Sequence, residues 1–277
     1  SKAARRLHLT ASAVSTSITE LERRLGVTLT IRERAKGVEM TPTGESVVGR
    51  ARELLADARA LQDDLRGNGP VVGPVRIGCY PSLGPTILPP LIRAFIEQHP
   101  NATVDFHEAT QDELRNLLDR GQLDLAVIYD LDRPVGWHLL ILQRRAPMVV
   151  LPSRHRLAVG DGGLRLADLA DEPMVLLDAP PSSYHAHALC AQAGFTPRVV
   201  YRTRNYETAR SFVGWGLGWT LLVQRPYADT TYSGDPLVIR ASTDPELAQV
   251  SIGLSWNGAQ PLSRASRAFL DLARDFN

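Results

Sequence analysis

LTASAVSTSITELERRLG, residues 9 to 26, is the stretch that decides the fold of the first part of this chain. Thr10 is a suitable N-cap, because its hydroxyl can accept a hydrogen bond from an N–H of the first helical turn. Four apolar residues follow at spacings of four, three and four: Val14, Ile18, Leu21 and Leu25. This spacing predicts a helix from Ala11 to Leu25 with one stripe facing a core, and Gly26 ends it as a left-handed glycine commonly does.

The opposite face of this helix carries small hydroxyl side chains, at Ser12, Ser15, Thr16 and Thr19. A helix that is merely solvated would normally carry Glu and Lys there. Small polar side chains let a helix enter the major groove of duplex DNA and bond to phosphates and base edges. The candidates for such contacts are Ala11, Ser12, Ser15 and Thr16. An ordinary amphipathic helix with a serine-rich face is the alternative.

A preceding helix and a following hairpin surround this stretch. Ser1 to Leu7 reads as a helix, and Val27–Ile31 and Val38–Met40 read as two short strands joined by a basic tip. A β-hairpin of this kind is a wing, which carries cations to the sugar-phosphate backbone, where affinity is electrostatic. Phosphate contacts are expected from Arg32, Arg34 and Lys36. Thr41, which follows the wing, is a further candidate for DNA contact.

Thr41-Pro42 opens a long helix, with threonine as the cap and proline at the first helical position. Six apolar residues then alternate at spacings of four and three along about 27 Å of helix: Val47, Ala51, Leu54, Ala58, Leu61 and Leu65. A seam this narrow suits pairing with a second helix and predicts a dimer. Dimers of helix-turn-helix proteins read two DNA half-sites. Packing of the helix on its own domain is the alternative.

These elements carry a family resemblance. The run Ala3-Ala4-x-x-Leu7-x-Leu9-Thr10-x-Ser12-Ala13-Val14-Ser15-x-x-Ile18-x-x-Leu21-Glu22-x-x-Leu25-Gly26-Val27-x-Leu29, with Thr41-x-x-Gly44, resembles the DNA-binding signature of LysR-type transcription regulators. The resemblance implies that the family's first helix precedes Ser1 and is missing here. Ala11, Ser12 and Thr16 are shorter than the family's usual readers, so DNA shape is expected to carry more of the specificity. Thr30 replaces the usual phenylalanine before the wing.

The rest of the chain alternates strands and helices after a hinge rich in Gly and Pro at residues 67–74. Strands at Val75–Cys79, Thr103–His107 and Leu123–Tyr129 alternate with helices, which predicts a mostly parallel α/β sheet. Gly121-x-Leu123-Asp124-Leu125-Ala126 resembles the effector domain of LysR-type regulators, which is similar to type 2 periplasmic binding proteins. A second strand-and-helix set follows from about Val149 to Pro236, before strands at Leu237–Ile239 and Val250–Ser255 and a last helix.

The resemblance implies three parts. Residues 1–45 form a winged helix-turn-helix that binds DNA, and residues 46–73 form a dimerisation helix and hinge. Residues 74–277 form an effector-binding domain, with lobe I at 74–148 and 237–277 and lobe II at 149–236. Dimers that pair into tetramers are expected from the family.

Ligands of open α/β sheets lie beyond the carboxyl ends of strands, near helix N-termini that attract carboxylates. A small-molecule effector in the cleft between the lobes is expected at such loops. The candidates are Ser82, Thr86, Thr110, Tyr129, Ser183, Arg204 and Tyr206. Arg204 suits an acidic group, which it could hold with two hydrogen bonds. A surface salt bridge is the alternative role for Arg204.

The sequence carries no catalytic constellation, so binding rather than turnover is predicted. His185, His187 and Cys190 are the nearest approach to a metal cluster, but residues two apart on a helix point to different faces. No metal or cofactor is expected. Gly214 to Gly218 reads as a tight turn rather than a phosphate loop. Cys79 and Cys190 are expected to be buried thiols, with a redox-sensing pair as the alternative.

Composition and charge agree with these predictions. The chain is 44% hydrophobic and 22% charged, has no apolar run long enough for a membrane span and shows no signal peptide. Residues 1–45 carry eight Lys/Arg against five Asp/Glu, whereas residues 67–277 carry nineteen against twenty-one. A basic head on a slightly acidic body suits a protein whose head binds DNA. Two cysteines are too few for a disulfide framework and are compatible with a reducing cytoplasm.

The sequence lacks the features expected of two rival functions. A free-standing solute-binding module should have a signal peptide and no wing. An enzyme of periplasmic-binding-protein fold should lack the heptad helix and carry a cofactor-attaching cysteine in a loop, whereas Cys79 is predicted in a strand.

Overall fold

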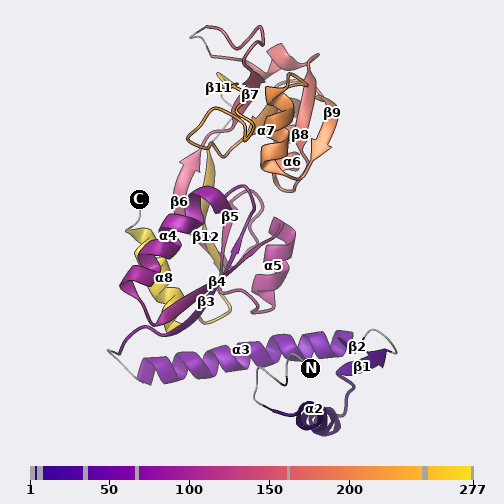
Figure 1. The fold of residues 1–277 in the computed structure, drawn as a ribbon, viewed down its shortest axis with the longest axis vertical. Helices are drawn as coiled ribbons and strands as arrows, with labels where there is room; N and C mark the ends of the chain where they lie inside the picture. Colours follow the sequence, from indigo (N-terminus) through magenta and orange to yellow (C-terminus); the bar gives the residue numbers. More distant parts are fainter. Residues whose placement is uncertain are drawn as a thin grey trace. The chain divides into compact units, whose positions relative to one another are not determined.

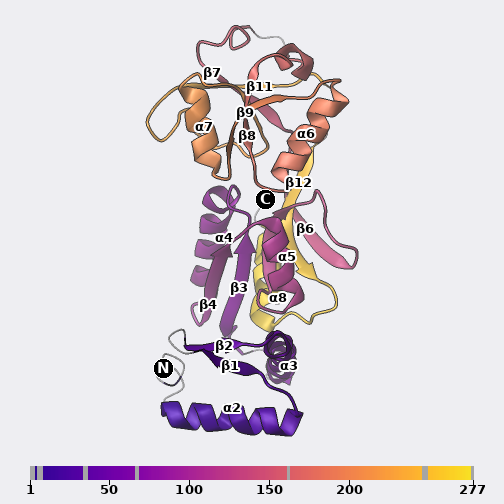
Figure 2. The same ribbon diagram turned by 90° about the vertical axis from the view of Figure 1, so that its right-hand side faces the viewer.

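The computed structural model describes Ala4 and residues 9–33, 37–65, 69–160, 163–244 and 249–275. The chain forms two compact units, Ser1–Ala58 and Arg59–Asn277. Figures 1 and 2 show the helices and strands of each unit. Across the described residues, no helix is both long and apolar enough to cross a membrane.

The first unit contains helix α2 (Ala11–Leu25), a hairpin of β1 (Thr30–Glu33) and β2 (Gly37–Met40), and the start of α3 (Pro42–Leu65). Thr10 caps α2 as predicted, because its Oγ1 accepts a hydrogen bond from the N–H of Ala13 at 3.1 Å. Gly26 ends α2 in the left-handed conformation, with φ of 70°. The predicted helix at residues 1–7 lies outside the described residues, apart from Ala4.

The first strand of the hairpin begins three residues later than predicted. Glu22 on α2 is the reason, because its Oε1 accepts hydrogen bonds from the N–H groups of Leu29 at 2.7 Å and Thr30 at 2.9 Å. Glu22 thus holds Leu29 and Thr30 against α2, while the carbonyl oxygens of Thr28 and Leu29 accept hydrogen bonds from Thr41, directly after β2. Their attachment fixes the start of the hairpin relative to the helix.

The predicted burial of the α2 stripe is wrong at its C-terminal end. Leu21 is 44% exposed and Leu25 is 48% exposed, while Val14 and Ile18 are only half-buried. The spacing correctly predicted an amphipathic helix, but spacing alone does not specify what covers the apolar stripe.

The second unit contains two lobes. The first lobe has a five-stranded sheet in the order β4-β3-β5-β12-β6. Its strands are β3 (Gly73–Cys79), β4 (Ala102–Glu108), β5 (Leu125–Tyr129), β6 (Trp137–Arg145) and β12 (Val250–Asn257), and its helices are α4 (Gly84–Gln98), α5 (Gln111–Asp119) and α8 (Arg264–Arg274). β3 runs parallel to β4 and β5, as predicted, whereas β12 runs antiparallel to β5 and β6. The sheet is therefore mixed, and β6 had not been predicted.

The second lobe has two small sheets, β10-β7-β11 and β8-β9. Its strands are β7 (Met148–Pro152), β8 (Pro173–Leu177), β9 (Arg198–Thr203), β10 (Thr220–Leu222) and β11 (Leu237–Ala241), and its helices are η1 (Leu166–Leu169), α6 (Ser182–Gln192) and α7 (Tyr206–Gly214). The sheets meet at a parallel bridge between Met174 and Trp219. Trp219 is buried in a core with Leu166 and Leu189.

The structure corrects the predicted return to the first lobe at residue 237. β11 pairs antiparallel with β7 over five residues, from Leu237 opposite Pro152 to Ala241 opposite Met148. It therefore belongs to the sheet of the second lobe, and β12 is the strand that returns. The chain crosses between the lobes after β6 and again before β12 (Figure 1).

Candidate functional site

A cavity of about 460 Å³ lies between the two lobes of the second unit. Its volume falls within the range of about 300–1000 Å³ that is usual for small-molecule pockets. Segments that follow β3, β4, β8, β9 and β10 contribute to its walls. The lining residues are Tyr80, Pro81, Ser82, Pro85, Thr86, Glu108, Thr110, Leu177, Ala179, Arg204, Asn205, Tyr206, Glu207, Arg210, Gln224, Pro226 and Tyr232.

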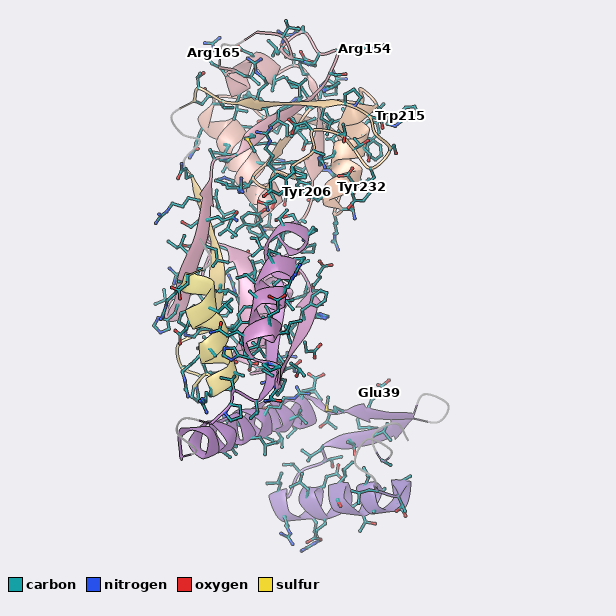
Figure 3. The ribbon with its side chains drawn as sticks, turned by 60° about the vertical axis from the view of Figure 1, so that its left-hand side comes forward. Glu39, Arg154, Arg165, Tyr206, Trp215 and Tyr232 are labelled. Carbon is teal, nitrogen blue, oxygen red and sulfur yellow. The ribbon has the colours of Figure 1, made fainter. Side chains whose placement is uncertain are left out.

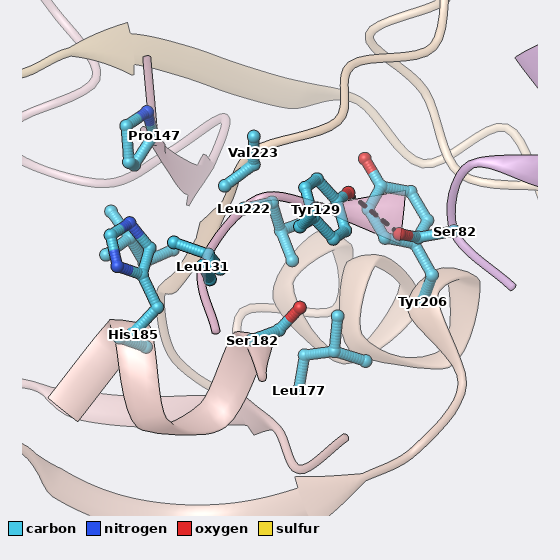
Figure 4. Close-up of a pocket in the computed structure, with 12 residues that line it drawn as sticks. Ser82, Tyr129, Leu131, Pro147, Leu177, Ser182, His185, Tyr206, Leu222 and Val223 are labelled. Atoms are coloured by element: carbon cyan, nitrogen blue, oxygen red, sulfur yellow. Dashed lines mark hydrogen bonds between the residues drawn. The ribbon is translucent and has the colours of Figure 1, made fainter. Parts of the chain in front are cut away.

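Three hydroxyl side chains lie at or next to one wall of the cavity, those of Tyr80, Ser82 and Tyr129. Tyr80 Oη donates a hydrogen bond to the carbonyl oxygen of Ala179 at 2.8 Å, which joins the first lobe to the second. The hydroxyls of Ser82 and Tyr129 are hydrogen-bonded to each other at 2.9 Å (Figure 4). Burial raises the pKa of both tyrosines, so each phenol is neutral at pH 7. This wall therefore presents hydroxyl groups, which are polar but uncharged.

Gln224, which lines the cavity from the second lobe, is hydrogen-bonded to Thr86 of the first. Its side-chain amide donates a hydrogen bond to Thr86 Oγ1 at the start of α4, and its main-chain carbonyl oxygen accepts one from Tyr206 Oη on α7. Only 3% of Gln224 is exposed. Its side-chain oxygen, Oε1, has no hydrogen-bond partner among the described residues.

A buried ion pair holds the loop that forms one wall. Arg210 Nη1 lies 2.8 Å from Glu207 Oε2, and both side chains are on α7. Arg210 Nη2 donates to the carbonyl oxygens of Ala228 at 2.9 Å and Thr230 at 2.8 Å, and Glu207 Oε1 accepts from the N–H of Tyr232 at 2.7 Å. The loop that carries Tyr232 is therefore fixed beside Tyr206 (Figure 3).

A smaller cavity, of about 20 Å³, adjoins the large one and shares Ser82, Leu177 and Tyr206 with it. Figure 4 shows its lining, in which His185 and Ser182 from α6 face Tyr129 and Leu131 of the first lobe. Burial lowers the pKa of His185, and its Nε2 has no hydrogen-bond partner in the part of the chain that the structure describes. The space is about the size of one water molecule.

Six of the seven predicted effector residues line these cavities. Ser82, Thr86, Thr110, Arg204 and Tyr206 line the large one, and Tyr129 lines the small one with Ser82 and Tyr206. Ser183 lines neither cavity and is only 3% exposed. Its neighbour Ser182 takes the predicted place, one residue earlier at the start of α6.

Sequence reasoning missed several residues that line the pocket. Glu108 is the last residue of β4, so the rule that places ligands beyond strand ends could have included it. Gln224, Pro226 and Tyr232 come from the long loop after β10. No local pattern in that loop marks them: hydrogen bonds to Thr86 and Tyr206 hold Gln224, and the buried Glu207–Arg210 pair holds the part of the loop that carries Tyr232.

The candidates for DNA contact fall into three groups. Ala11, Ser12 and Thr16 are exposed on α2, and Ser15 is half-buried. Thr41 is buried, and its hydroxyl donates to the carbonyl oxygen of Thr28 at 2.7 Å while accepting from the N–H of Gly44 at 2.9 Å. Thr41 thus caps α3 within the fold. Arg34 and Lys36 lie outside the described residues, as does the side chain of Arg32.

The heptad seam of α3 is exposed where it is described. Leu54 is 70% exposed, Ala51 and Ala58 are exposed, and Val47 is half-buried. The side chains of Leu61 and Leu65 lie outside the described residues.

Among the residues that the structure describes, the cysteines and histidines form no recognisable metal or redox centre. No group of three or more His, Cys, Asp or Glu residues within the described ranges is arranged to hold a metal ion. His187 Nδ1 is hydrogen-bonded to the carbonyl oxygen of Ser183 at 2.8 Å. Both cysteines are buried, which raises the pKa of Cys190 to about 11 and that of Cys79 further. Their thiols are therefore neutral and poorly nucleophilic.

A helix with a following wing on one unit, and a two-lobed body with a pocket between its lobes on the other, define a class of ligand-responsive DNA-binding proteins. Residues 1–45 match the model of the bacterial regulatory helix-turn-helix protein, lysR family, and residues 68–277 match that of the LysR substrate binding domain. The chain therefore belongs to the LysR family of transcription regulators.

Relatives over the whole chain support this assignment. The chain is 28% identical over 99% of its length to the HTH-type transcriptional regulator YvbU of Bacillus subtilis, covering 92% of that protein. It is 32% identical to HinK, a LysR family regulator of Pseudomonas aeruginosa, with a TM-score of 0.69 over 99% of this chain and 91% of that one. The C-terminal domain of a probable LysR family regulator from Rhodococcus sp. RHA1 is 54% identical, with a TM-score of 0.72 over 73% of this chain and 99% of that one.

Proposed function

We propose that this LysR-family regulator responds to a small organic acid or a related metabolite, bound in the cavity between its lobes. The observation that carries this proposal is the cavity of about 460 Å³, which gathers hydroxyl, amide and charged side chains from both lobes. Ser82, Thr86, Thr110, Arg204 and Tyr206 would contact the effector. Tyr129 would hold the Ser82 hydroxyl in position through the hydrogen bond between the two side chains.

In this proposal, residues 1–45 bind DNA, residues 46–73 dimerise and residues 74–277 bind the effector. Ala11, Ser12, Ser15 and Thr16 would enter the major groove, and Arg32, Arg34 and Lys36 would contact phosphates. The exposed apolar seam of α3 supports a homodimer, which would pair into a homotetramer. An exposed apolar stripe at heptad spacing suits burial against a second copy.

Effector binding would alter DNA binding through the arrangement of the lobes. A ligand that contacts both lobes favours the arrangement in which all its contacts are made. Because the coupling is a free energy shared by two sites, DNA must change effector affinity by the same factor as effector changes DNA affinity.

DNA binding is tested by mobility shift of the full chain on its own upstream region at several salt concentrations. We expect affinity to fall steeply with salt, and Arg32→Ala to reduce the slope of log K against log salt by about 1. Ser12→Ala should instead relax the preference among operator sequences and leave the slope unchanged. Absence of any salt-sensitive attachment to duplex DNA would overturn the proposed function.

Effector binding is tested by thermal shift of the full chain with a panel of small acids and amino acids. A ligand that binds only the folded state raises the melting temperature by mass action. Ser82→Ala and Arg204→Ala should remove the shift caused by the compound that binds. A shift that persists in both variants would place the ligand elsewhere.

A further inference from the structure

The charged groups that line the large cavity divide into a satisfied pair and two that remain available. Glu207 and Arg210 lie 2.8 Å apart, are buried and are engaged with the backbone of the 228–232 loop. The other two are Glu108, at the end of β4 in the first lobe, and Arg204, after β9 in the second. Both side chains are exposed and make no hydrogen bond or salt bridge among the described residues, although the charge of Arg204 helps to lower the pKa of the Glu113 carboxyl.

Glu108 changes what the start of α4 can bind. Its Oε1 lies 2.6 Å from the position that a Cβ on Gly84 would take, so the carboxylate adjoins the first residue of that helix. A helix N-terminus favours negative charge, and here the protein supplies that charge itself. A ligand carboxylate at this place would meet like charge. Helix N-termini in general attract carboxylates, but Glu108 makes the start of α4 an unfavourable place for the acidic group of a ligand.

Acceptors collect on the same side of the cavity. Gln224 donates its amide to Thr86 Oγ1 at the start of α4, so its side chain also lies there. Its Oε1 lacks a partner within the described residues and is held in a side chain that is only 3% exposed. A buried acceptor without a partner costs free energy that a ligand N–H can recover. A carboxylate and an amide oxygen together favour a ligand ammonium.

Arg204 supplies the opposite charge from the second lobe. The nearby carboxylate of Glu113 is already engaged, since it accepts hydrogen bonds from the N–H of Thr110 at 2.9 Å and from its Oγ1 at 2.8 Å. The guanidinium of Arg204 can therefore hold a ligand carboxylate with paired hydrogen bonds. The rest of the lining combines uncharged polar side chains, such as Ser82 and Thr110, with the aromatic rings of Tyr80, Tyr206 and Tyr232.

We propose that the effector is a zwitterion, an α-amino acid or a close relative, with its ammonium at Glu108 and Gln224 Oε1 and its carboxylate at Arg204. This inference rests on the proposed function, because it specifies the ligand of the same cavity. Such a ligand joins opposite charges on the two lobes, so it binds best when both lobes surround it.

Matched compounds separate the contributions of the two charges. The twenty standard amino acids are screened on the full chain by thermal shift, and the binders are measured by calorimetry beside their single-charge analogues. For a phenylalanine binder, these are 3-phenylpropanoate and 2-phenylethylamine, and for a leucine binder, 4-methylpentanoate and 3-methylbutylamine. We expect the amino acid to bind at least tenfold more tightly than either analogue.

Two variants test the placement of the charges. Glu108→Gln should lower the affinity for the amino acid at least tenfold and bring it near that of the acid analogue, whose own affinity should not fall. Arg204→Gln should also lower the affinity for the amino acid at least tenfold and bring it near that of the amine analogue, whose own affinity should not fall. Asp171→Asn and Arg154→Gln remove exposed charges of the same kinds outside the cavity, and they should change nothing. Arg154 lies on the side of its lobe away from Tyr206 and Tyr232 (Figure 3).

Several results would overturn the inference. One is an acid analogue that binds within threefold of the amino acid, and another is a Glu108→Gln variant that keeps the wild-type preference. In both cases a ligand is bound, so the proposed sensing function would stand. A screen in which no amino acid binds would also overturn the inference, whereas DNA binding is judged by its own salt-dependence experiment. If Glu108→Gln does not fold, the affinities of the wild-type chain for the amino acid and its two analogues still test whether both charges of the ligand are needed.

Discussion

Arg210 and Glu207 form a buried ion pair in which the guanidinium lies 2.8 Å from the carboxylate, with side chains only 4% and 11% exposed. The two residues are one turn apart on α7. Arg210 also donates to the carbonyl oxygens of Ala228 and Thr230, and Glu207 accepts from the N–H of Tyr232. The pair therefore acts as a clamp between a helix and the loop that walls the effector pocket. The loop itself offers little apolar surface for burial, since Tyr227 and Tyr232 are exposed.

Arg210→Met should destabilise the second unit by about 3–5 kcal/mol, because it leaves the carboxylate of Glu207 buried without its partner. It should also release the loop that carries Tyr232. Chemical denaturation of the full chain measures the first effect, and proteolysis within residues 225–235 measures the second. Arg165→Met removes an exposed arginine from a pair of the same spacing, with Asp168, and should change neither. Equal stability of both variants would show that the buried pair is not a clamp.

Gly44→Ala should destabilise the first unit, because a Cβ at residue 44 would overlap the carbonyl oxygen of Leu29. That oxygen accepts a hydrogen bond from the N–H of Thr41 at 2.9 Å, so it cannot move without breaking the start of α3. We expect a loss of about 1–3 kcal/mol and weaker DNA binding, measured by denaturation and mobility shift. Thr43→Ala, at the exposed neighbouring position, is the control. An unchanged Gly44→Ala protein would mean that the close approach is absent in solution.

Glu22 should make the first unit sensitive to acid. Hydrogen bonds from the N–H groups of Thr30 and Leu29 hold the pKa of its carboxyl below the ordinary value of 4.5. A carboxyl whose pKa is lowered by folding stabilises the fold fully above its unfolded pKa, and this contribution is lost as pH falls through the folded pKa. The difference in melting temperature between wild type and Glu22→Gln should therefore be constant above about pH 5 and shrink below it.

A pH series of melting curves on the full chain checks this prediction. Glu39→Gln, an exposed substitution on β2, serves as the control for the general effect of removing a carboxylate. A difference between wild type and Glu22→Gln that persists unchanged down to pH 3 would refute the proposed link.

Leu54→Glu should weaken the proposed homodimer at least tenfold. Leu54 is 70% exposed in this chain, so its burial in a paired seam would contribute about 1.5–3 kcal/mol from each copy. Sedimentation equilibrium measures the dissociation constant, and Arg50→Glu on an exposed part of the same helix is the control. If Leu54→Glu dimerises as well as wild type, α3 does not pair through this seam.

Patterns within a few residues correctly predicted several elements. Thr10 and Gly26 marked the ends of α2 because capping depends on neighbouring N–H and C=O groups. An apolar run marked β5 because strands covered on both faces are apolar throughout, and Val75 to Cys79 marked β3 although Arg76 interrupts it. The rule for strand ends then placed five candidate residues at the large cavity.

The same local patterns failed where a distant partner decides the outcome. Leu237 to Ala241 was assigned to the first lobe, but pairing with β7, more than eighty residues earlier, places it in the second. Ser183 was chosen over Ser182 because the first turn of α6 gives no local sign of which hydroxyl faces the cavity. The sequence also shows no reason for Glu108 to stand beside Gly84.

The sequence alone determined the caps, turns and apolar spacing of single elements, because these act over a few residues, and its motifs resemble the LysR family, which implied a winged DNA-binding head and a two-lobed α/β body. Only the tertiary structure decided which side chains share the pocket. Thr86 and Gln224 are 138 residues apart, and Tyr80 and Ala179 are 99 apart. Folding brings such residues together through two crossings between lobes, and no local spacing encodes that encounter.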